Sequence, residues 1–361
     1  MPPISLMIKP ASSACNLNCK YCFYRDVSNN RQEHNFGMMS KDTAEILIKK
    51  ALDFADGSSV AFTFQGGEPM LAGIDFFKNF VEQVKACNTK ESKIFYALQT
   101  NATNIDDEWA AFFTENDFLI GISLDGDFER SKFRKYPNGE SSFNKIIKAI
   151  NCLKRNKTQF NIVSVLTGYS TQHAEEIYSF FRSKSLKYLQ FVPCLRPFGS
   201  NEKSELYMTP EQYADFLIKT FKLYVKDYAN GRYTSIRLFD NWVRLYLNQP
   251  PEQCGVSGHC SRQFVAESNG NIYPCDFYCT DKYLLGNIKE TTFNQMAESD
   301  TAKNFINESL IVSQKCKNCR YFPICRGGGC KREKLSEDYC ESFKKFFSEC
   351  LPLFSVFKNI Y

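Results

Sequence analysis

The first two hundred residues alternate between short apolar runs and longer amphipathic stretches, and this alternation restricts the possible folds more than any other feature. The apolar runs have strand length and are rich in β-branched and aromatic residues. In the clearest amphipathic stretch, Ser40 is a plausible N-cap, and apolar residues recur on one helical face. Strand–helix units with right-handed crossovers build a parallel sheet covered by helices, so we predict an α/β fold, a partial (β/α)6 TIM-like barrel. The predicted strands are residues 5–9, 60–64, 94–100, 118–125, 160–166 and 188–192.

The pattern changes near residue 200. Thr209-Pro210 predicts a capped helix start with proline at the first helical position. Residues 263–273 predict a β-hairpin that turns at Asn269-Gly270. Beyond residue 254 cysteine and glycine replace apolar residues, so we expect bound metal to supply stability there. The predicted organisation is a barrel over 1–200, a helical linker over 201–253 and a cysteine-rich domain with a C-terminal helix over 254–361.

Cysteine usage is unusual, with sixteen cysteines against three histidines. No basic region precedes an apolar run at the N-terminus, so we expect no signal peptide and a cytoplasmic protein. A reducing cytosol does not keep disulfides. Many thiolates with few imidazoles therefore indicate iron–sulfur clusters or all-cysteine zinc sites.

Charge and hydropathy exclude two classes of partner. Lys and Arg number 45 against 40 Asp and Glu, a net charge of +5, and they form no run that could follow a phosphate backbone. The longest apolar stretch, around residues 118–124, is far shorter than the ~20 residues needed to cross a bilayer. We therefore expect neither a nucleic-acid partner nor a membrane partner.

The strongest motif is Cys15-(x3)-Cys19-(x2)-Cys22, in the loop after the first predicted strand. Three thiolates can hold three irons of a [4Fe–4S] cube and leave the fourth iron open to a small molecule. The alternative is part of a zinc knuckle, but a structural zinc site normally takes four protein ligands, and no fourth is nearby.

A second group of eight cysteines lies in the C-terminal third. Eight thiolates are the inventory for two four-cysteine sites, and the pair at 316 and 319 read alone could also be half of a zinc ribbon. The eight are Cys254, Cys260, Cys275, Cys316, Cys319, Cys325, Cys330 and Cys340.

The first motif resembles the CxxxCxxC signature of the radical S-adenosylmethionine (SAM) family, with an aromatic residue before the last cysteine. Further matches follow in order: Gln65-Gly66-Gly67-Glu68-Pro69, Gln99-Thr100-Asn101 and Ser123-Leu124-Asp125-Gly126. They stand at the carboxyl ends of predicted parallel strands, where ligands bind, although each alone could be an ordinary strand-end turn. The resemblance implies a radical SAM barrel with a SAM site formed by Gly66, Gly67, Glu68, Ser123, Asp125 and Leu195.

The C-terminal spacing resembles the SPASM domain, which carries two auxiliary [4Fe–4S] clusters. The resemblance implies three [4Fe–4S] clusters and SAM as the cofactors. It assigns Cys254, Cys260, Cys275 and Cys330 to the first auxiliary cluster, and Cys316, Cys319, Cys325 and Cys340 to the second.

Over nearly its full length the chain resembles the anaerobic sulfatase-maturating enzymes, through motifs such as Cys22-Phe23-Tyr24 and Tyr273-Pro274-Cys275-Asp276. That family oxidises a Cys or Ser of a sulfatase to Cα-formylglycine. The resemblance implies Asp276 as the catalytic base, and a carboxylate suits a chain with so few histidines. It implies substrate contacts from Tyr24, Gln65 and Asn101. The implied partners are an unfolded or nascent sulfatase polypeptide and an electron donor such as flavodoxin or ferredoxin.

The sequence departs from this family pattern near two of the motifs. Ala102 replaces a usual Gly, Asp127 stands where Pro is usual, and a His that normally follows a few residues later is missing. No departure removes a predicted cluster ligand.

Two alternatives remain open at this point. One is a SPASM enzyme that installs a thioether or carbon cross-link on a ribosomal precursor peptide. Such enzymes often carry an extra N-terminal domain, and a motif that begins at Cys15 leaves no room for one. The other is a zinc-stabilised binding protein without catalysis.

Overall fold

The computed structural model describes residues 3–337 and 339–359. The predicted domain ends at residues 1 and 361 lie outside this range. The described chain forms two compact units that do not follow the sequence linearly. The first unit contains the residues up to Ser123, Arg134–Phe160 and Arg262–Phe305; the second contains Leu124–Phe133, Asn161–Ser261 and the residues from Ile306 onward.

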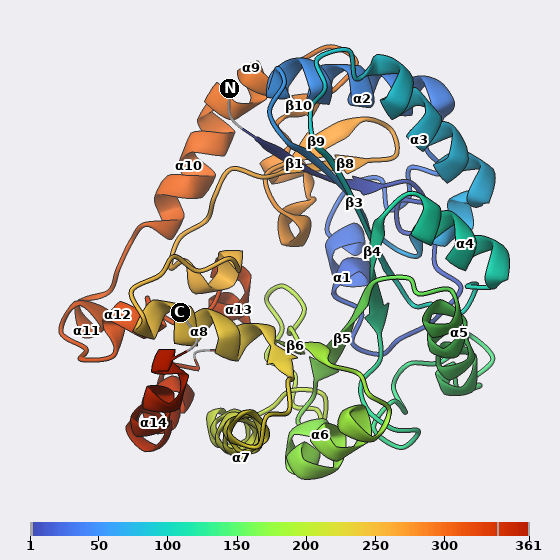
Figure 1. Cartoon of the computed structure of the whole chain (residues 1–361). Helices are drawn as coiled ribbons and strands as arrows, with labels where there is room; N and C mark the ends of the chain where they lie inside the picture. The colour runs from blue at the N-terminus through green and yellow to red at the C-terminus, as the bar shows by residue number, and fades with distance from the viewer. Residues whose placement is uncertain (1–2, 338, 360–361) are drawn as a thin grey trace. The chain divides into compact units, whose positions relative to one another are not determined.

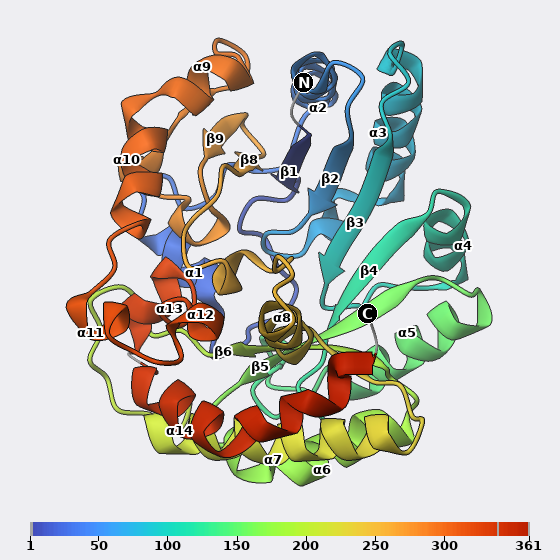
Figure 2. The same cartoon turned by 60° about the vertical axis from the view of Figure 1, so that its left-hand side comes forward.

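The first unit is built on a mostly parallel sheet. Four strands pair in parallel in chain order, as Figure 2 shows, and β8 adds to the outer edge of β1, also in parallel. β9 and β10 continue that edge in antiparallel pairing. The strands are β1 (Ile4–Lys9), β2 (Val60–Phe64), β3 (Ile94–Thr100), β4 (Phe118–Ser123), β8 (Phe264–Glu267), β9 (Asn271–Tyr273) and β10 (Gly286–Asn287).

Helices between these strands cover the sheet, with α2 and α3 side by side (Figure 1). Buried phenylalanines form the core: the ring centroid of Phe64 lies 4.9 Å from that of Phe77 and 5.0 Å from that of Phe80. The helices are α1 (Phe23–Asn29), α2 (Lys41–Ala55), α3 (Ile74–Cys87), α4 (Asp107–Glu115), α5 (Phe143–Arg155), α9 (Phe293–Glu298) and α10 (Asp300–Ser309), which begins in this unit, with 3-10 turns η1 (Pro69–Ala72), η4 (Asp276–Tyr278) and η5 (Asp281–Tyr283).

The second unit combines three parallel strands with a helical layer. Its α7 and α14 lie along each other (Figure 2), and the ring of Phe221 on α7 packs 5.3 Å from that of Phe346 on α14. The elements are β5 (Phe160–Leu166), β6 (Tyr188–Pro193), β7 (Ser235–Ile236), α6 (Ala174–Ser183), α7 (Pro210–Ala229), α8 (Arg237–Tyr246), α11 (Gln314–Lys317), α12 (Phe322–Cys325), α13 (Lys331–Ser336) and α14 (Cys340–Cys350), with 3-10 turns η2 (Ser170–His173), η3 (Cys254–Val256) and η6 (Leu351–Asn359).

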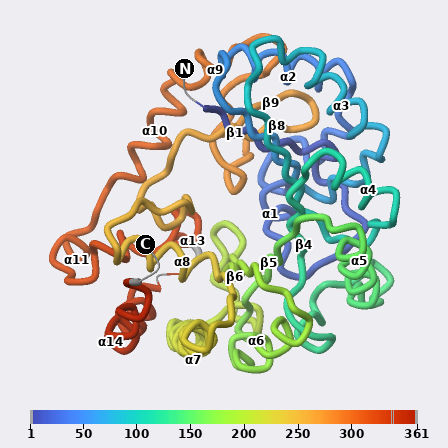
Figure 3. Tube along the Cα trace, in the orientation of Figure 1, coloured from blue at the N-terminus to red at the C-terminus, as the bar shows by residue number. Residues whose placement is uncertain are grey.

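The local predictions agree closely with these elements. β2, β3 and β5 have the predicted bounds, and the other three predicted strands differ only by one or two residues at an end. The side chain of Ser40 caps α2, and Thr209 forms a capping box at the start of α7. The predicted hairpin is present as β8 and β9, visible beside β1 in the trace of Figure 3.

One expectation about the C-terminal third is wrong in part. Residues 262–305 do not lack a core, because Phe264, Ile272, Phe293 and Met296 are all buried in the first unit. These apolar residues recur with the periods of a hairpin and a helix. The high local density of cysteine and glycine made this apolar pattern hard to recognise in the sequence. In the part of the chain that the structure describes, no helix is long and apolar enough to span a bilayer.

Candidate active site

The predicted cysteine motif lies in the loop between β1 and α1, and Cys22 is the N-cap residue of α1. Burial raises the pKa of the Cys15 thiol to about 12, against a hydrogen bond from the backbone N–H of Leu17. The charges of Cys19 and Cys22 also raise it, so the three thiols are close enough to interact. Such a thiol is held as a thiolate only beside strong positive charge, which iron supplies. The donor set therefore fits an iron–sulfur cluster.

Two glycines after β2 hold this loop close to the sheet. The backbone N–H of Gly67 donates to the carbonyl oxygen of Ser12 over 2.9 Å. A Cβ atom at Gly67 would lie 2.0 Å from the carbonyl oxygen of Ala14, so no other residue fits this contact. Gly66 has a φ of +130° and lies against the stem of Lys9. The close approach of the cysteine loop therefore requires glycine at both positions.

Glu68 is buried, and its carboxylate ties the loop after β2 to the end of β3. It accepts hydrogen bonds from the backbone N–H groups of Met70 and Asn101 and from the hydroxyl of Thr100, at 3.1, 2.8 and 2.8 Å. Burial raises the pKa of Glu68 to about 7, although these three donors lower it. The Asn101 side chain donates to Asn16 over 2.8 Å, within the cysteine loop. Asn101, predicted as a substrate contact, is therefore placed against the cysteine loop.

The remaining predicted SAM residues divide between the two units. In the first, the Ser123 hydroxyl at the end of β4 accepts a hydrogen bond from Gln99 over 2.9 Å. In the second, Asp125 is buried and accepts from the backbone N–H of Val165 over 2.9 Å. Leu195 is half-buried after β6, also in the second unit.

Asp276 begins the turn η4 after the hairpin and is 7% exposed. One carboxylate oxygen accepts from the side-chain amide of Gln65 over 2.7 Å, and the other forms an ion pair with Lys9. Gln65 follows β2, and Lys9 ends β1. The structure therefore unites two predicted residues, Asp276 and Gln65, and adds Lys9, which was not predicted.

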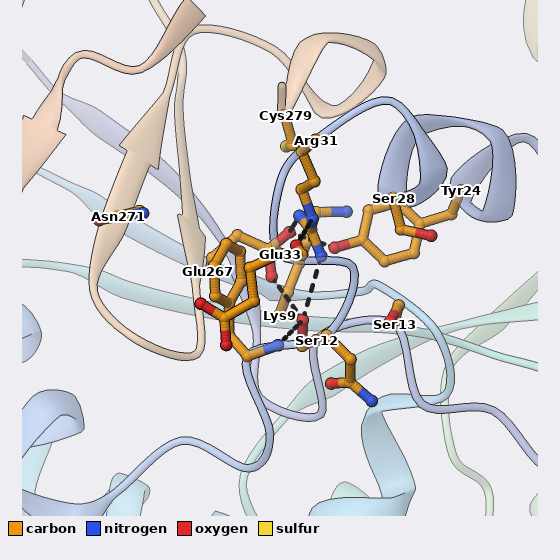
Figure 4. Close-up of polar contacts among 12 residues, drawn as sticks. Lys9, Ser12, Ser13, Tyr24, Ser28, Arg31, Glu33, Glu267, Asn271 and Cys279 are labelled. Carbon is orange, nitrogen blue, oxygen red and sulfur yellow. Dashed lines mark hydrogen bonds and ion pairs between the residues drawn. The ribbon is translucent and has the colours of Figure 1, made fainter. Parts of the chain in front are cut away.

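Tyr24 lies inside a buried polar network (Figure 4), although it was predicted to line a peptide site. Its hydroxyl donates to Glu267, and its ring centroid lies 3.8 Å from the Lys9 ammonium. Glu267 also pairs with Arg31 over 2.7 Å and accepts from Ser12 over 3.1 Å. The network thus contains two buried ion pairs, Lys9–Asp276 and Arg31–Glu267.

The sequence reasoning missed Lys9, Arg31 and Glu267. A signal existed for two of them, since Lys9 and Glu267 each end a mostly apolar strand, where buried charge is unusual without a partner. Their Cα atoms are register partners in the β1–β8 pairing. Arg31 lies in a polar stretch after α1 and gave no such signal.

The cysteines of the second predicted group fall in both units: Cys275 lies in the first and the other seven in the second. Burial raises the pKa of Cys325 to about 11, and the charges of Cys340, Cys316 and Cys319 raise it too. Those three thiols therefore lie within range of electrostatic interaction with Cys325. Within residues 3–337 and 339–359, no three His, Cys, Asp or Glu side chains are gathered as a single metal ion would need.

Comparison with known proteins adds to this geometry. Residues 10–181 match the model of the radical SAM superfamily, and residues 257–320 match that of an iron–sulfur cluster-binding domain, SPASM. The chain is 45% identical over 359 residues to a cysteine-type anaerobic sulfatase-maturating enzyme of Clostridium novyi (strain NT), covering 97% of this chain and 96% of the relative. The chain belongs to the anaerobic sulfatase-maturating enzymes. The predicted resemblance is confirmed, and the chain is a radical SAM enzyme rather than a zinc-stabilised binding protein.

Two further matches refine this. A serine-type relative from Bacteroides thetaiotaomicron is 28% identical over 383 residues, covering 99% of this chain and 92% of the relative. A solved structure described as native anSMEcpe with bound AdoMet and Cp18Cys peptide has a TM-score of 0.94 and 40% identity, covering 100% of both chains. The predicted partial barrel with a C-terminal SPASM domain is thereby confirmed as the fold.

Proposed function

We propose that this chain oxidises a cysteine side chain of a sulfatase polypeptide to Cα-formylglycine. The observation that carries the proposal is the difference in full-length identity: 45% to a cysteine-type relative against 28% to a serine-type one. The structural relative with a TM-score of 0.94 holds AdoMet and a peptide named for cysteine, which supports the same choice.

The proposed cofactors are SAM and three [4Fe–4S] clusters. Cys15, Cys19 and Cys22 would hold the cluster that binds SAM, because three thiolates leave the fourth iron of such a cluster open to a small molecule. The auxiliary ligand sets are those predicted: Cys254, Cys260, Cys275 and Cys330 for one, and Cys316, Cys319, Cys325 and Cys340 for the other. The charges of Cys316, Cys319 and Cys340 raise the pKa of Cys325, which supports the second set.

The proposed SAM site consists of Gly66, Gly67, Glu68, Ser123, Asp125 and Leu195. The backbone of the glycine pair approaches the cysteine loop closely, which supports a ligand site against that loop. The carboxylate of Glu68 already accepts three hydrogen bonds from the chain, so its contribution includes fixing the loop as well as meeting a ligand.

The conversion of cysteine to formylglycine is a two-electron oxidation, followed by replacement of sulfur by water oxygen with release of hydrogen sulfide. When bound, SAM and its cluster supply the one-electron oxidant that removes a hydrogen atom from the cysteine Cβ. The thiol must also lose its proton, and the substrate must lose one further electron, which one of the proposed auxiliary [4Fe–4S] clusters would accept. Asp276 takes that proton on its carboxylate, and Gln65 holds the carboxylate on one side.

The substrate is an unfolded or nascent sulfatase segment, and Tyr24, Gln65 and Asn101 are proposed to position it. Of these, Gln65 has direct support, because it contacts Asp276. In the described structure the hydroxyl of Tyr24 donates to Glu267, and the side chain of Asn101 donates to Asn16 in the cysteine loop. An electron donor such as flavodoxin or ferredoxin in the cytoplasm would supply reducing electrons.

The test uses the anaerobically reconstituted protein with SAM, a chemical reductant and two sulfatase-motif peptides that differ only in Cys or Ser. We expect formylglycine from the cysteine peptide, at least ~10-fold faster than from the serine peptide, because a pocket selects modestly between similar groups. Mass analysis of the peptides and chromatography of 5′-deoxyadenosine provide the two measurements. SAM cleavage without aldehyde from either peptide would overturn the proposal.

A further inference from the structure

A lysine is completely buried at the end of β1. The side chain of Lys9 has 0% exposure and forms an ion pair with Asp276, whose side chain is 10% exposed. A buried ammonium group is costly unless it is paired, so such a lysine requires a specific partner. Lys9 and Asp276 are 267 residues apart in the sequence. The pair therefore depends on the tertiary structure.

The surroundings of Lys9 direct it to Asp276 rather than to the other nearby carboxylate. Glu267 is the register partner of Lys9, but it already accepts from Arg31, Tyr24 and Ser12 (Figure 4). The charge of Arg31 compensates that of Glu267, which leaves the charge of Lys9 for Asp276.

The path of the lysine side chain is confined along its length. Gly66 lies beside its stem, where an added Cβ would be 3.2 Å from the Cβ of Lys9. The Tyr24 ring lies 3.8 Å from the ammonium nitrogen, at a distance suited to a cation–π contact. A side chain confined in this way holds its ammonium group at one place.

Asp276 consequently has a donor on each carboxylate oxygen: Lys9 on one and Gln65 on the other, the latter at 2.7 Å. Both donors come from the ends of neighbouring strands, β1 and β2, whereas Asp276 itself stands on a three-residue 3-10 turn. A carboxylate that is bonded at both oxygens cannot rotate. The ends of β1 and β2 therefore fix the orientation of the Asp276 carboxylate, which the short 3-10 turn alone would not.

We propose that Lys9 is a positioning residue for Asp276, which fixes the carboxylate in the orientation needed to take the substrate proton. This inference rests on the proposed role of Asp276 as the base in formylglycine formation. Without Lys9 the carboxylate turns away, and cleavage of SAM continues without completing the oxidation. The diagnostic quantity is therefore the formylglycine formed per 5′-deoxyadenosine, the coupling ratio.

The main variant is Lys9→Met, which keeps the length of the side chain and removes the donor. We expect the coupling ratio to fall at least ~10-fold, since small misplacements of a catalytic group have effects of this size or larger. We expect the KM for the cysteine peptide, the iron content and the SAM affinity to stay within ~3-fold of wild type. A purely structural role would not change the ratio, because unfolded protein neither cleaves SAM nor makes product.

The matched control is Asp227→Asn in the second unit, which removes a buried carboxylate that pairs with Arg182 and leaves both donors to Asp276. It should lose thermal stability to a similar extent and keep the wild-type coupling ratio. A second test variant, Lys9→Gln, retains a hydrogen-bond donor without charge and should lose less coupling than Lys9→Met.

Wild-type coupling in both Lys9 variants would overturn the proposal, as would an equal loss of coupling in the Asp227→Asn control. Failure of both Lys9 variants to fold would assign Lys9 to the scaffold and overturn it too. If the wild type itself cleaves SAM but forms no formylglycine, the proposed function fails instead, and the two failures are thus distinct.

Discussion

The two cysteine-bearing regions of this chain are held in different ways. The loop with Cys15, Cys19 and Cys22 is fixed by other parts of the first unit: Gly67 and Glu68 donate backbone hydrogen bonds to it, and Asn101 adds a side-chain bond.

The segment 310–337 in the second unit has mostly local backbone bonds, such as Cys319 to Cys316. Among its described side chains, Tyr321 is the only buried apolar one, while Ile311 is 81% exposed. The first region is thus organised by protein contacts, whereas we expect the second to depend on bound metal for its order.

The largest expected effect is on folding of the second region. Cys316→Ala/Cys319→Ala should lose about a third of the iron, one cluster of three. It should also lower the Tm by at least about 10 °C, the shift expected for about 3–5 kcal/mol in a unit of this size. Iron analysis and thermal unfolding measure both. Cys87→Ala is the control, a half-buried helical cysteine outside all three predicted ligand sets. An unchanged Tm in the double variant would break the comparison.

The matching change in the first region should abolish SAM cleavage but leave the protein folded. The Cys15→Ala/Cys19→Ala/Cys22→Ala variant should also lose about a third of the iron, and with it all SAM cleavage. Its Tm should fall by less than half as much as in the Cys316/Cys319 variant, because the aromatic core of the sheet is untouched. Iron equal to wild type would contradict the assignment of the three ligands.

A change at one side chain separates catalysis from scaffold within the first unit. Asp276→Asn keeps the side-chain shape but cannot take a proton, so formylglycine should fall at least ~100-fold while 5′-deoxyadenosine is still formed. The change also leaves Lys9 buried without its counter-charge, at a cost of about 3–5 kcal/mol. Adding Lys9→Met should recover much of that stability and none of the product. Product at nearly the wild-type rate in Asp276→Asn would place the base elsewhere.

The smallest effect concerns Ala102, which stands where the family usually has glycine. Its φ of +62° lies in the left-handed region, which costs an L-residue about 1–2 kcal/mol. Ala102→Gly removes this strain, which stabilises the folded state. It also removes a buried methyl group and makes the unfolded chain more flexible, and both of these destabilise the protein. Because the effects offset each other, the free energy of unfolding should stay within about 0.5 kcal/mol of wild type. Ala51→Gly, inside α2, should cost at least about 1 kcal/mol. Chemical denaturation of both variants makes the comparison, and an equal loss in the two would contradict the strain at Ala102.

Much of the architecture could be predicted because it is encoded locally. The strands β2, β3 and β5 and the caps at Ser40 and Thr209 were found from period and capping alone. The cysteine motif was found in the same way, since its spacing is a property of one short segment. Asp276 came from resemblance to a family and not from any physical pattern.

The sequence by itself therefore determined the strand–helix order, the cysteine motifs and the family. Only the tertiary structure decided that Lys9 meets Asp276 and that Arg31 meets Glu267. The reason is physical: periodicity reports which face of a segment is buried, but not which distant segment covers that face. Both pairs arise because β8 joins the edge of β1 in parallel register, a pairing between residues more than two hundred positions apart.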